Sequence, residues 1–298
     1  RVLLTSTFKM NPCVIPMDKE RLNSPSTSAI CLEVMGHQLQ FSQDPNSKHL
    51  GTTVWDASMV FIKFLERNCR KGRFSPLKLK GKRVIELGAG CGVAGFGMAM
   101  LGCNVILTDQ KEVLPLLMRN VERNTSRVSQ VKDEVADSFG SVRVEELVWG
   151  NEHHILATEP PFDYIVGTDV VYSEHLLEPL LNTIHALSGP RTTILIGYEM
   201  RSTSVHEKMQ SMWKENFEVK VVPRSKLDRN YQHASIQLYA MRVKEFTRNV
   251  KMDCNEDEVC SENGEEDEVL IQKGKLTEWD ARRMGSMAAR LLTNVKIT

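Results

Sequence analysis

The sequence has no excess of charge of either sign and no long apolar run. Its 298 residues include 38 Lys and Arg and 38 Asp and Glu, so the formal net charge is zero. A broad nucleic-acid interface usually needs a clear basic excess, so we expect no nucleic-acid partner. A membrane-spanning helix needs about 20 consecutive apolar residues, and no apolar run approaches that length, so we expect no membrane partner.

Paired cysteines are also missing. The seven cysteines are odd in number, and none of them forms a C-x-x-C pair. This pattern indicates neither a disulfide framework nor a zinc site, and we expect no metal. His153 and His154 are adjacent, and in a strand they would point to opposite faces, which makes them poor co-ligands. Free thiols are typical of a reducing compartment, which predicts a cytoplasmic location and leaves a nuclear one open.

Composition divides the chain into four parts. Residues 1–27 are polar and contain three prolines, and we interpret them as a flexible arm. Residues 28–245 carry the regular apolar patterns and are predicted to form the folded domain. Residues 246–275 are acidic and of low complexity, which is typical of a disordered linker. Residues 276–298 return to helical periodicity and predict a C-terminal helix.

Strands and helices alternate through most of the predicted domain. This alternation predicts an α/β fold with a mostly parallel sheet and helices on both faces. The last two predicted strands, residues 217–223 and 235–243, are joined by a helix-free loop, which predicts an antiparallel hairpin at one edge. Residues 29–43 alternate on both sides of Gly36 and predict a small N-terminal β-hairpin.

A glycine-rich turn separates a predicted strand from the helix that follows it. Residues 86–92 read E-L-G-A-G-C-G, and Asp109 ends the next predicted strand. Glycines let the backbone turn sharply and approach a ligand closely, and an open parallel sheet binds its ligand beyond the carboxyl ends of its strands. An acid at Asp109 suits both hydroxyls of a ribose, which a nicotinamide dinucleotide and S-adenosylmethionine both contain.

Glycine spacing alone does not separate these two cofactors. From Gly90 the sequence G-C-G-V-A-G ends at Gly95 and matches the dinucleotide fingerprint G-x-G-x-x-G. From Gly88 the third glycine is replaced by Val93. Glu86 favours S-adenosylmethionine, because a carboxylate there would repel a pyrophosphate and suits the α-amino group of the methionine moiety, directly or through water.

A second group of polar residues follows the fourth predicted strand. Asp169 and Tyr172 stand in the sequence D-V-V-Y. That strand is expected beside the first one, across the point where the strand order reverses, so both side chains should face the reactive end of the cofactor. The alternative is a solvated acid and a core tyrosine at an ordinary strand end.

These motifs together resemble a known family. The E-L-G-A-G-C-G turn, T-D after the second strand, V-W-G after the third and D-V-V-Y after the fourth resemble the seven-β-strand (class I) methyltransferases. G-T-T-V-W-D-A-S-M-V-F-I-K-F-L-E upstream is similar to the methyltransferase-like 21 group of protein-lysine methyltransferases. Residues 226–242 resemble the branch of this group that methylates valosin-containing protein. The resemblance spans about residues 29–243 and implies a Rossmann-like, seven-stranded sheet.

The resemblance implies S-adenosylmethionine as cofactor and a lysine of a protein, a chaperone or AAA ATPase, as methyl acceptor. It implies that Asp109 binds the ribose, that Trp149 packs on the adenine and that Trp55 walls the pocket. For both tryptophans the alternative is a place in the core. Asp169 and Tyr172 shape the path of the lysine and place its amine. The predicted cofactor-binding residues are Trp55, Glu86, Gly88, Ala89, Gly90, Gly92, Asp109, Gln110, Trp149 and Asp169.

Methyl transfer to an amine is an in-line displacement that needs no metal. The enzyme must hold the amine and the methyl group close and aligned, and it must favour the neutral amine of a lysine whose ordinary pKa is about 10.4. Asp169 attracts an ammonium, so we expect it to capture and orient the lysine and not to act as a strong base. The alternatives are methylation of a small molecule or another side chain, a nicotinamide-dependent oxidoreductase, or a non-catalytic adaptor. The sequence does not indicate an oligomeric state.

Overall fold

The computed structural model describes residues 22–23, 26–131 and 134–244. The predicted arm lies mostly outside these residues, and the predicted acidic linker and C-terminal helix lie wholly outside them, so the proposed division of the chain stays a prediction. Within the described part of the chain, no helix is long and apolar enough to cross a membrane.

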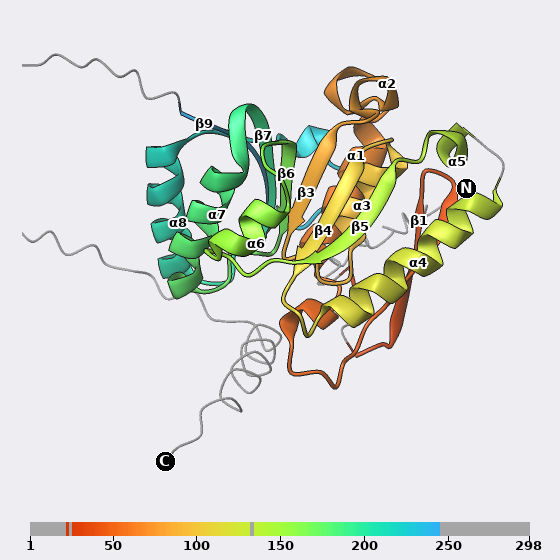
Figure 1. The fold of residues 1–298 in the computed structure, drawn as a ribbon, viewed down its shortest axis with the longest axis horizontal. Helices are drawn as coiled ribbons and strands as arrows, with labels where there is room; N and C mark the ends of the chain where they lie inside the picture. The colour runs from red at the N-terminus through yellow and green to blue at the C-terminus, as the bar shows by residue number, and fades with distance from the viewer. Residues whose placement is uncertain (1–21, 24–25, 132–133, 245–298) are drawn as a thin grey trace, which may run out of the picture.

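A seven-stranded sheet has the order β5-β4-β3-β6-β7-β9-β8 (Figure 1). Strands β3 to β7 pair in parallel, and β9 pairs antiparallel with both β7 and β8. The predicted sheet and its antiparallel edge hairpin are therefore confirmed. The strands are β3 (Arg83–Leu87), β4 (Asn104–Asp109), β5 (Ser141–Glu146), β6 (Phe162–Thr168), β7 (Ser188–Glu199), β8 (Phe217–Val221) and β9 (Ile236–Val243).

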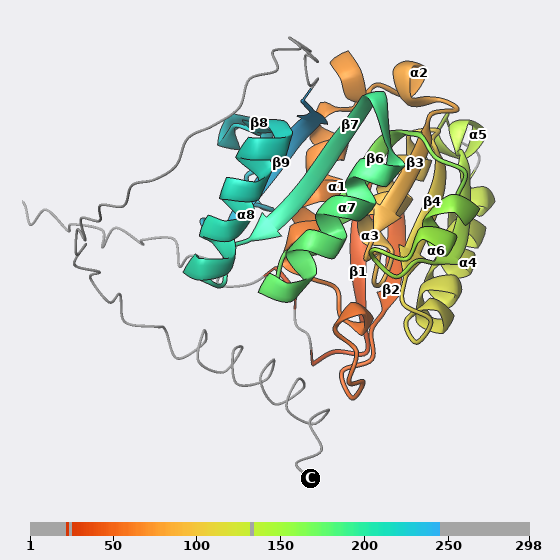
Figure 2. The ribbon, with the colours of Figure 1, turned by 60° about the vertical axis from the view of Figure 1, so that its left-hand side comes forward.

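Helices cover both faces of this sheet (Figures 1 and 2). In β3, Val84 packs into the core on the side of α1 and α3, and the next residue, Ile85, packs under α6, α7 and α8. This alternation is what a strand buried on both faces requires. The helices are α1 (Asp56–Asn68), α2 (Pro76–Leu79), α3 (Val93–Met100), α4 (Leu114–Gln130), α5 (Glu134–Ser138), α6 (Glu152–Ala157), α7 (Leu177–Leu187) and α8 (Thr203–Asn216).

The predicted N-terminal hairpin is confirmed as β1 (Ala29–Val34) and β2 (His37–Ser42), which pair antiparallel outside the main sheet. Two buried carboxamides of α4 take the place of a neighbouring strand. Asn120 accepts from the Ser42 N–H at 2.8 Å and donates to its carbonyl at 3.1 Å. Asn124 does the same for Gln40, at 2.8 and 3.0 Å. These bonds hold β2 against α4 and thereby position the start of the segment that runs from β2 to Trp55.

Several local predictions are wrong. His153 and His154 lie in α6 and not in a strand, because the Asn151 side chain caps that helix by accepting from the His154 N–H at 3.2 Å. The pattern of residues 141–150 predicts one strand over that whole range, but strand β5 ends at Glu146. The loop between β8 and β9 is not helix-free, since a 3-10 turn forms there at Arg224–Lys226.

Candidate active site

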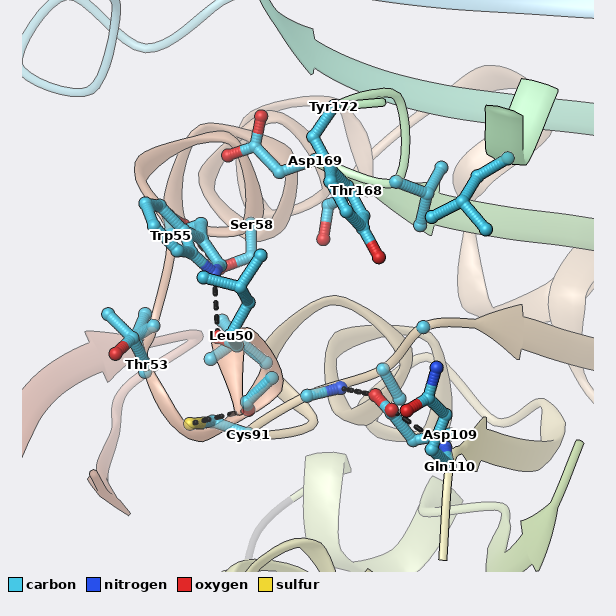
Figure 3. A pocket seen from close by; sticks show the side chains of 18 of the residues that line it. Leu50, Thr53, Trp55, Ser58, Cys91, Asp109, Gln110, Thr168, Asp169 and Tyr172 are labelled. Atoms are coloured by element: carbon cyan, nitrogen blue, oxygen red, sulfur yellow. Dashed lines mark hydrogen bonds between the residues drawn. The ribbon is translucent and has the colours of Figure 1, made fainter. Parts of the chain in front are cut away.

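A cavity opens at the carboxyl ends of β3, β4 and β6, with about 970 Å³ of empty space that is continuous with solvent (Figure 3). Strand β3 lies between β4 and β6, so the strand order reverses here, as predicted. Such a reversal is where open α/β sheets bind ligands. Most predicted site residues line this cavity: Trp55, Gly88, Ala89, Gly90, Asp109, Gln110, Trp149, Asp169 and Tyr172.

Two predicted cofactor contacts are absent from this cavity wall. Glu86 is fully buried beneath the turn, and its Oε2 accepts from the Gly95 N–H of α3 at 2.8 Å. Burial raises the pKa of this carboxyl group to about 8. Gly92 precedes α3 with φ of 87°, and a Cβ there would lie 2.7 Å from the Leu117 side chain. Both residues therefore support the glycine turn on the side away from the cavity. The packing of α3 and α4 decides this placement, and the sequence motif alone does not show it.

The floor of the cavity is bare backbone. Gly90 has φ of 57°, and a Cβ on it would lie 2.9 Å from the Gly51 carbonyl oxygen. Gly88 has φ of 60°, and a Cβ there would lie 3.0 Å from Val170 and 3.3 Å from Trp149. The left-handed backbone and these close approaches both require glycine. The turn can therefore seat a ligand that lies flat against peptide groups.

Asp109 is held at the end of β4 by the same turn (Figure 3). Its Oδ2 accepts from the Gly90 N–H at 2.7 Å, and its Oδ1 from the Gln110 N–H at 2.8 Å. Burial raises the pKa of Asp109, and these two bonds oppose that rise. A carboxylate can accept about four hydrogen bonds, so two donors such as ribose hydroxyls can still be accommodated. The ring of Trp149, beside Gly88, offers an aromatic face for a base.

Figure 3 shows Asp169 and Trp55 across the cavity from Asp109 and Gln110. The Trp55 indole Nε1 donates to the Leu50 carbonyl at 3.0 Å, which fixes the ring at the wall. Asp169 follows β6 with φ of 56°, so the chain turns sharply as it leaves the strand. Asp169 and Trp55 therefore lie apart from Asp109, whereas the Tyr172 hydroxyl lies within electrostatic range of it. Burial raises the pKa of Tyr172, and Asp109 raises it further.

Two charged residues of this region were missed by the sequence reasoning. Arg201 lines the cavity and pairs with Asp169 at 3.0 Å and with Glu199 at 2.8 Å. Its guanidinium carbon lies 4.9 Å from the centre of the Trp55 ring. Asp169 is therefore an ion-paired acid, and the sequence did not predict this partner. The sequence feature that could have identified both residues is E-M-R at positions 199–201. This motif lies at the end of β7, which runs parallel to β6 and ends beside it.

Burial raises the pKa of Asp169, the Arg201 guanidinium lowers it and Glu199 raises it, with a net rise. Burial lowers the pKa of Arg201, but the two carboxylates outweigh that effect and raise it. The region thus keeps a guanidinium cation beside two acids. Among the residues that the structure describes, no group of three His, Cys, Asp or Glu side chains could hold a metal ion.

The sequence matches the family model described as lysine methyltransferase over residues 34–215. It is 35% identical over 191 residues to the protein N-lysine methyltransferase METTL21A of Danio rerio, covering 63% of this chain and 80% of that protein. It is 30% identical over 185 residues to METTL21A of Xenopus tropicalis, covering 62% and 77%. It is 32% identical over 168 residues to EEF1A lysine methyltransferase 3 of Mus musculus, covering 56% and 64%.

These similarities agree with the cavity. A bare glycine turn, an acid at the end of β4 and an aromatic face suit S-adenosylmethionine, and the matched residues include all of them. They do not favour the alternatives of a nicotinamide-dependent oxidoreductase or a small-molecule methyltransferase. The family match spans more than half of the sequence, from β1 to the last turn of α8. This chain belongs to the lysine methyltransferase family.

Proposed function

We propose that this protein transfers methyl groups from S-adenosylmethionine to the side-chain amine of a lysine in a protein substrate. The observation that carries the proposal is the two-ended cavity of a chain in the lysine methyltransferase family. One end has the glycine turn and Asp109, the other has Asp169 and Trp55, and Tyr172 lines the wall of the same cavity.

The residues at the two ends have separate tasks in this proposal. The bound cofactor supplies a methyl group made electrophilic by its sulfonium. Asp109 holds the ribose, and the glycine turn holds the methionine moiety against the backbone. Asp169 and Tyr172 orient the amine, while the Trp55 ring narrows the passage so that the amine approaches in line. Alignment of this kind contributes to catalysis by proximity and needs no covalent enzyme intermediate.

The substrate class is a protein, because the METTL21A relatives are named protein N-lysine methyltransferases. Two candidates are suggested by different observations. The resemblance of residues 226–242 to the valosin-containing-protein branch favours an AAA ATPase, and a mouse relative is named for EEF1A. Of these two we propose the AAA ATPase as the first to test, with EEF1A as the next. A chaperone, which the sequence resemblance also implies, is the third candidate.

The test is incubation of the purified protein with tritiated S-adenosylmethionine and a cell extract, followed by electrophoresis. Parallel reactions contain purified valosin-containing protein or EEF1A. Asp169→Asn is the variant that we expect to be inactive. Asp163→Asn is its matched control, because Asp163 is an acid at the opposite end of β6 that pairs with Lys82 at 2.9 Å.

One or a few labelled bands are expected with the wild type and Asp163→Asn, and weak bands or none with Asp169→Asn. Amino-acid analysis of a band should yield methyl-lysine. Cofactor binding without any labelled protein would contradict a protein substrate, and label on another amino acid would contradict lysine. Failure to bind the cofactor would overturn the assignment of the glycine turn.

We also propose that the protein works in a reducing compartment, the cytoplasm or the nucleus. In support, Cys31, Cys69, Cys91 and Cys103 are free thiols. Cell fractionation with an antibody to the protein tests this location, and recovery in a secretory fraction would contradict it.

A further inference from the structure

Three buried charges lie together at the acceptor end of the cavity. Side-chain exposure is 1% for Asp169, 7% for Glu199 and 15% for Arg201. Two carboxylates thus pair with the same guanidinium. Buried charges are tolerated when they are paired, and removing one partner leaves the other uncompensated. The charge of this cluster therefore depends strongly on Arg201.

Two buried polar atoms of the cluster also have unused hydrogen-bonding capacity, and they belong to side chains that line the cavity. Asp169 Oδ1 accepts from the Glu199 N–H at 3.1 Å. Apart from the ion pair, Asp169 Oδ2 accepts no hydrogen bond in the described part of the protein, and Arg201 Nε donates none. Both side chains line the cavity. Buried polar atoms that lack a partner are uncommon in native proteins and point to a bound polar group.

We propose that Arg201 is a positioning residue that sets the charge felt by the amine of the substrate lysine. Its guanidinium offsets Asp169, so that the carboxylate can orient the amine without trapping it as an ammonium. This inference rests on the proposed function. An uncompensated carboxylate within hydrogen-bonding range would raise the pKa of an amine by about one to three units, and a nearby cation opposes that rise.

Within the part of the chain that the structure describes, the other titratable groups beside the cluster do not replace this cation. Tyr198 lies on β7 beside the three charges, and burial raises the pKa of its hydroxyl to about 12, which keeps it neutral. His233 reaches Glu199 only through the Ser235 hydroxyl, at 2.6 and 3.5 Å. Asp109, on β4, adds negative charge from across the cavity. Among the described residues that line the cavity, Arg201 is the one Lys or Arg.

The test uses two cofactor analogues as probes and needs no protein substrate. Sinefungin carries an amine on carbon in place of the methyl sulfonium, whereas S-adenosylhomocysteine has neither a methyl group nor an amine at that position. Both molecules keep the α-amino group of the amino-acid moiety. The ratio of their dissociation constants therefore reports how favourably the site binds an ammonium at the position where the methyl group is transferred to the lysine. Calorimetry at a pH of about 7 keeps that amine protonated. The proteins compared are the wild type, Arg201→Met, Arg201→Lys and Glu199→Gln.

Loss of the cation in Arg201→Met is expected to favour sinefungin over S-adenosylhomocysteine by about tenfold relative to the wild type, which corresponds to about one pKa unit. Glu199→Gln removes a negative charge and should shift the preference in the opposite direction. Arg201→Lys keeps the charge and should keep the wild-type ratio. A purely structural role for Arg201 predicts instead that the lysine and methionine variants change both affinities alike.

A ratio that changes by less than about twofold in Arg201→Met would overturn the proposal. If Arg201→Met does not fold, Arg201→Gln takes its place, because it also removes the cation but keeps a polar side chain. Failure of the wild type to bind S-adenosylhomocysteine would overturn the proposed function as well. Normal binding with unchanged ratios would overturn only the role of Arg201.

Discussion

At the residue scale, Asp109 joins the glycine turn to the proposed ribose site. Replacing it with alanine removes the acceptor of the Gly90 N–H and the proposed acceptor of the ribose hydroxyls. Hydrogen bonds to a charged group contribute about 1.5 to 3 kcal/mol each, so Asp109→Ala should weaken S-adenosylmethionine binding by at least about tenfold. Calorimetric titration of the purified variant measures this loss.

Asp163 provides the control for Asp109. It is also an acid in a strand of the same sheet, and it accepts from the Lys82 side chain and from the Arg83 N–H, both at 2.9 Å. Asp163→Ala should lower stability and leave cofactor affinity unchanged, because this residue does not line the cavity. Equal losses of affinity in the two variants would show that Asp109 acts through folding and not through the ribose.

Glu86 makes the stability of the protein depend on pH. Burial raises its pKa from 4.5 to about 8 in the folded protein, so the folded state binds this proton more tightly than the unfolded chain. The stabilisation is fully present below pH 4.5 and is lost as pH rises through about 8. Glu86→Gln lacks this titration.

The melting temperature of Glu86→Gln, minus that of the wild type, should therefore increase between pH 4.5 and about 8. Thermal denaturation followed by circular dichroism across this range measures the difference. A constant offset can arise from the added amide group, so only the pH dependence is diagnostic. A difference independent of pH would show that the carboxyl group has an ordinary pKa.

At the scale of elements, the turn between β3 and α3 depends on the conformation of Gly90. An added methyl group would meet both a left-handed backbone and the Gly51 carbonyl oxygen at 2.9 Å. We expect Gly90→Ala to destabilise the protein and to weaken cofactor binding. Backbone strain of this kind costs about 1 to 3 kcal/mol before the collision is counted. Urea denaturation and cofactor titration measure the two effects.

Gly81 provides a control that separates the steric clash of an added Cβ from the strain of a left-handed backbone. Its φ is 73°, yet a Cβ there would have no atom within 4 Å. Gly81→Ala should show only the cost of the left-handed backbone, about 1 to 2 kcal/mol, with normal cofactor affinity. If the two alanine variants lost equal stability, the contact between the turn and Gly51 would not matter.

Most elements could be predicted from periodicity alone. All seven strands of the main sheet, the hairpin and the long helices were expected at these places. The ends of some elements were not, because they depend on contacts outside the local pattern. Two such ends are the start of α6, which Asn151 caps, and the end of β5 at Glu146. The short helices α2 and α5 are too brief for a periodic signal.

At the scale of the whole molecule, the cavity is built from segments far apart in the sequence. The segment that contains Gly51 and Trp55 follows the β1–β2 hairpin and contacts the glycine turn, and the hairpin is tied to α4 by Asn120 and Asn124. Asn124 is fully buried and satisfies both backbone groups of Gln40. Docking of the hairpin and closure of the cavity should therefore be coupled.

Asn124→Ala should uncouple them. Leaving a buried backbone group without a partner costs about 1 to 3 kcal/mol, so we expect a loss of this order in the free energy of unfolding. Amide hydrogen exchange should quicken in β2, and cofactor affinity should fall. Gln38→Ala, on the same strand but at an exposed site, is the control. Unchanged exchange in β2 would show that the hairpin is held by its apolar contacts alone.

The sequence by itself determined the order of strands and helices, the glycine turn and the acids at the strand ends. These features are local, because apolar periodicity and the bare turn are set by neighbouring residues. Only the tertiary structure decided which polar groups face the cavity. Glu86 turns its carboxylate to the Gly95 N–H, and Asp169 meets Arg201, since helix packing and strand neighbours bring distant charges together. The tertiary fold determines which group pairs with a buried charge, because the cost of removing that charge from water arises only when the chain folds.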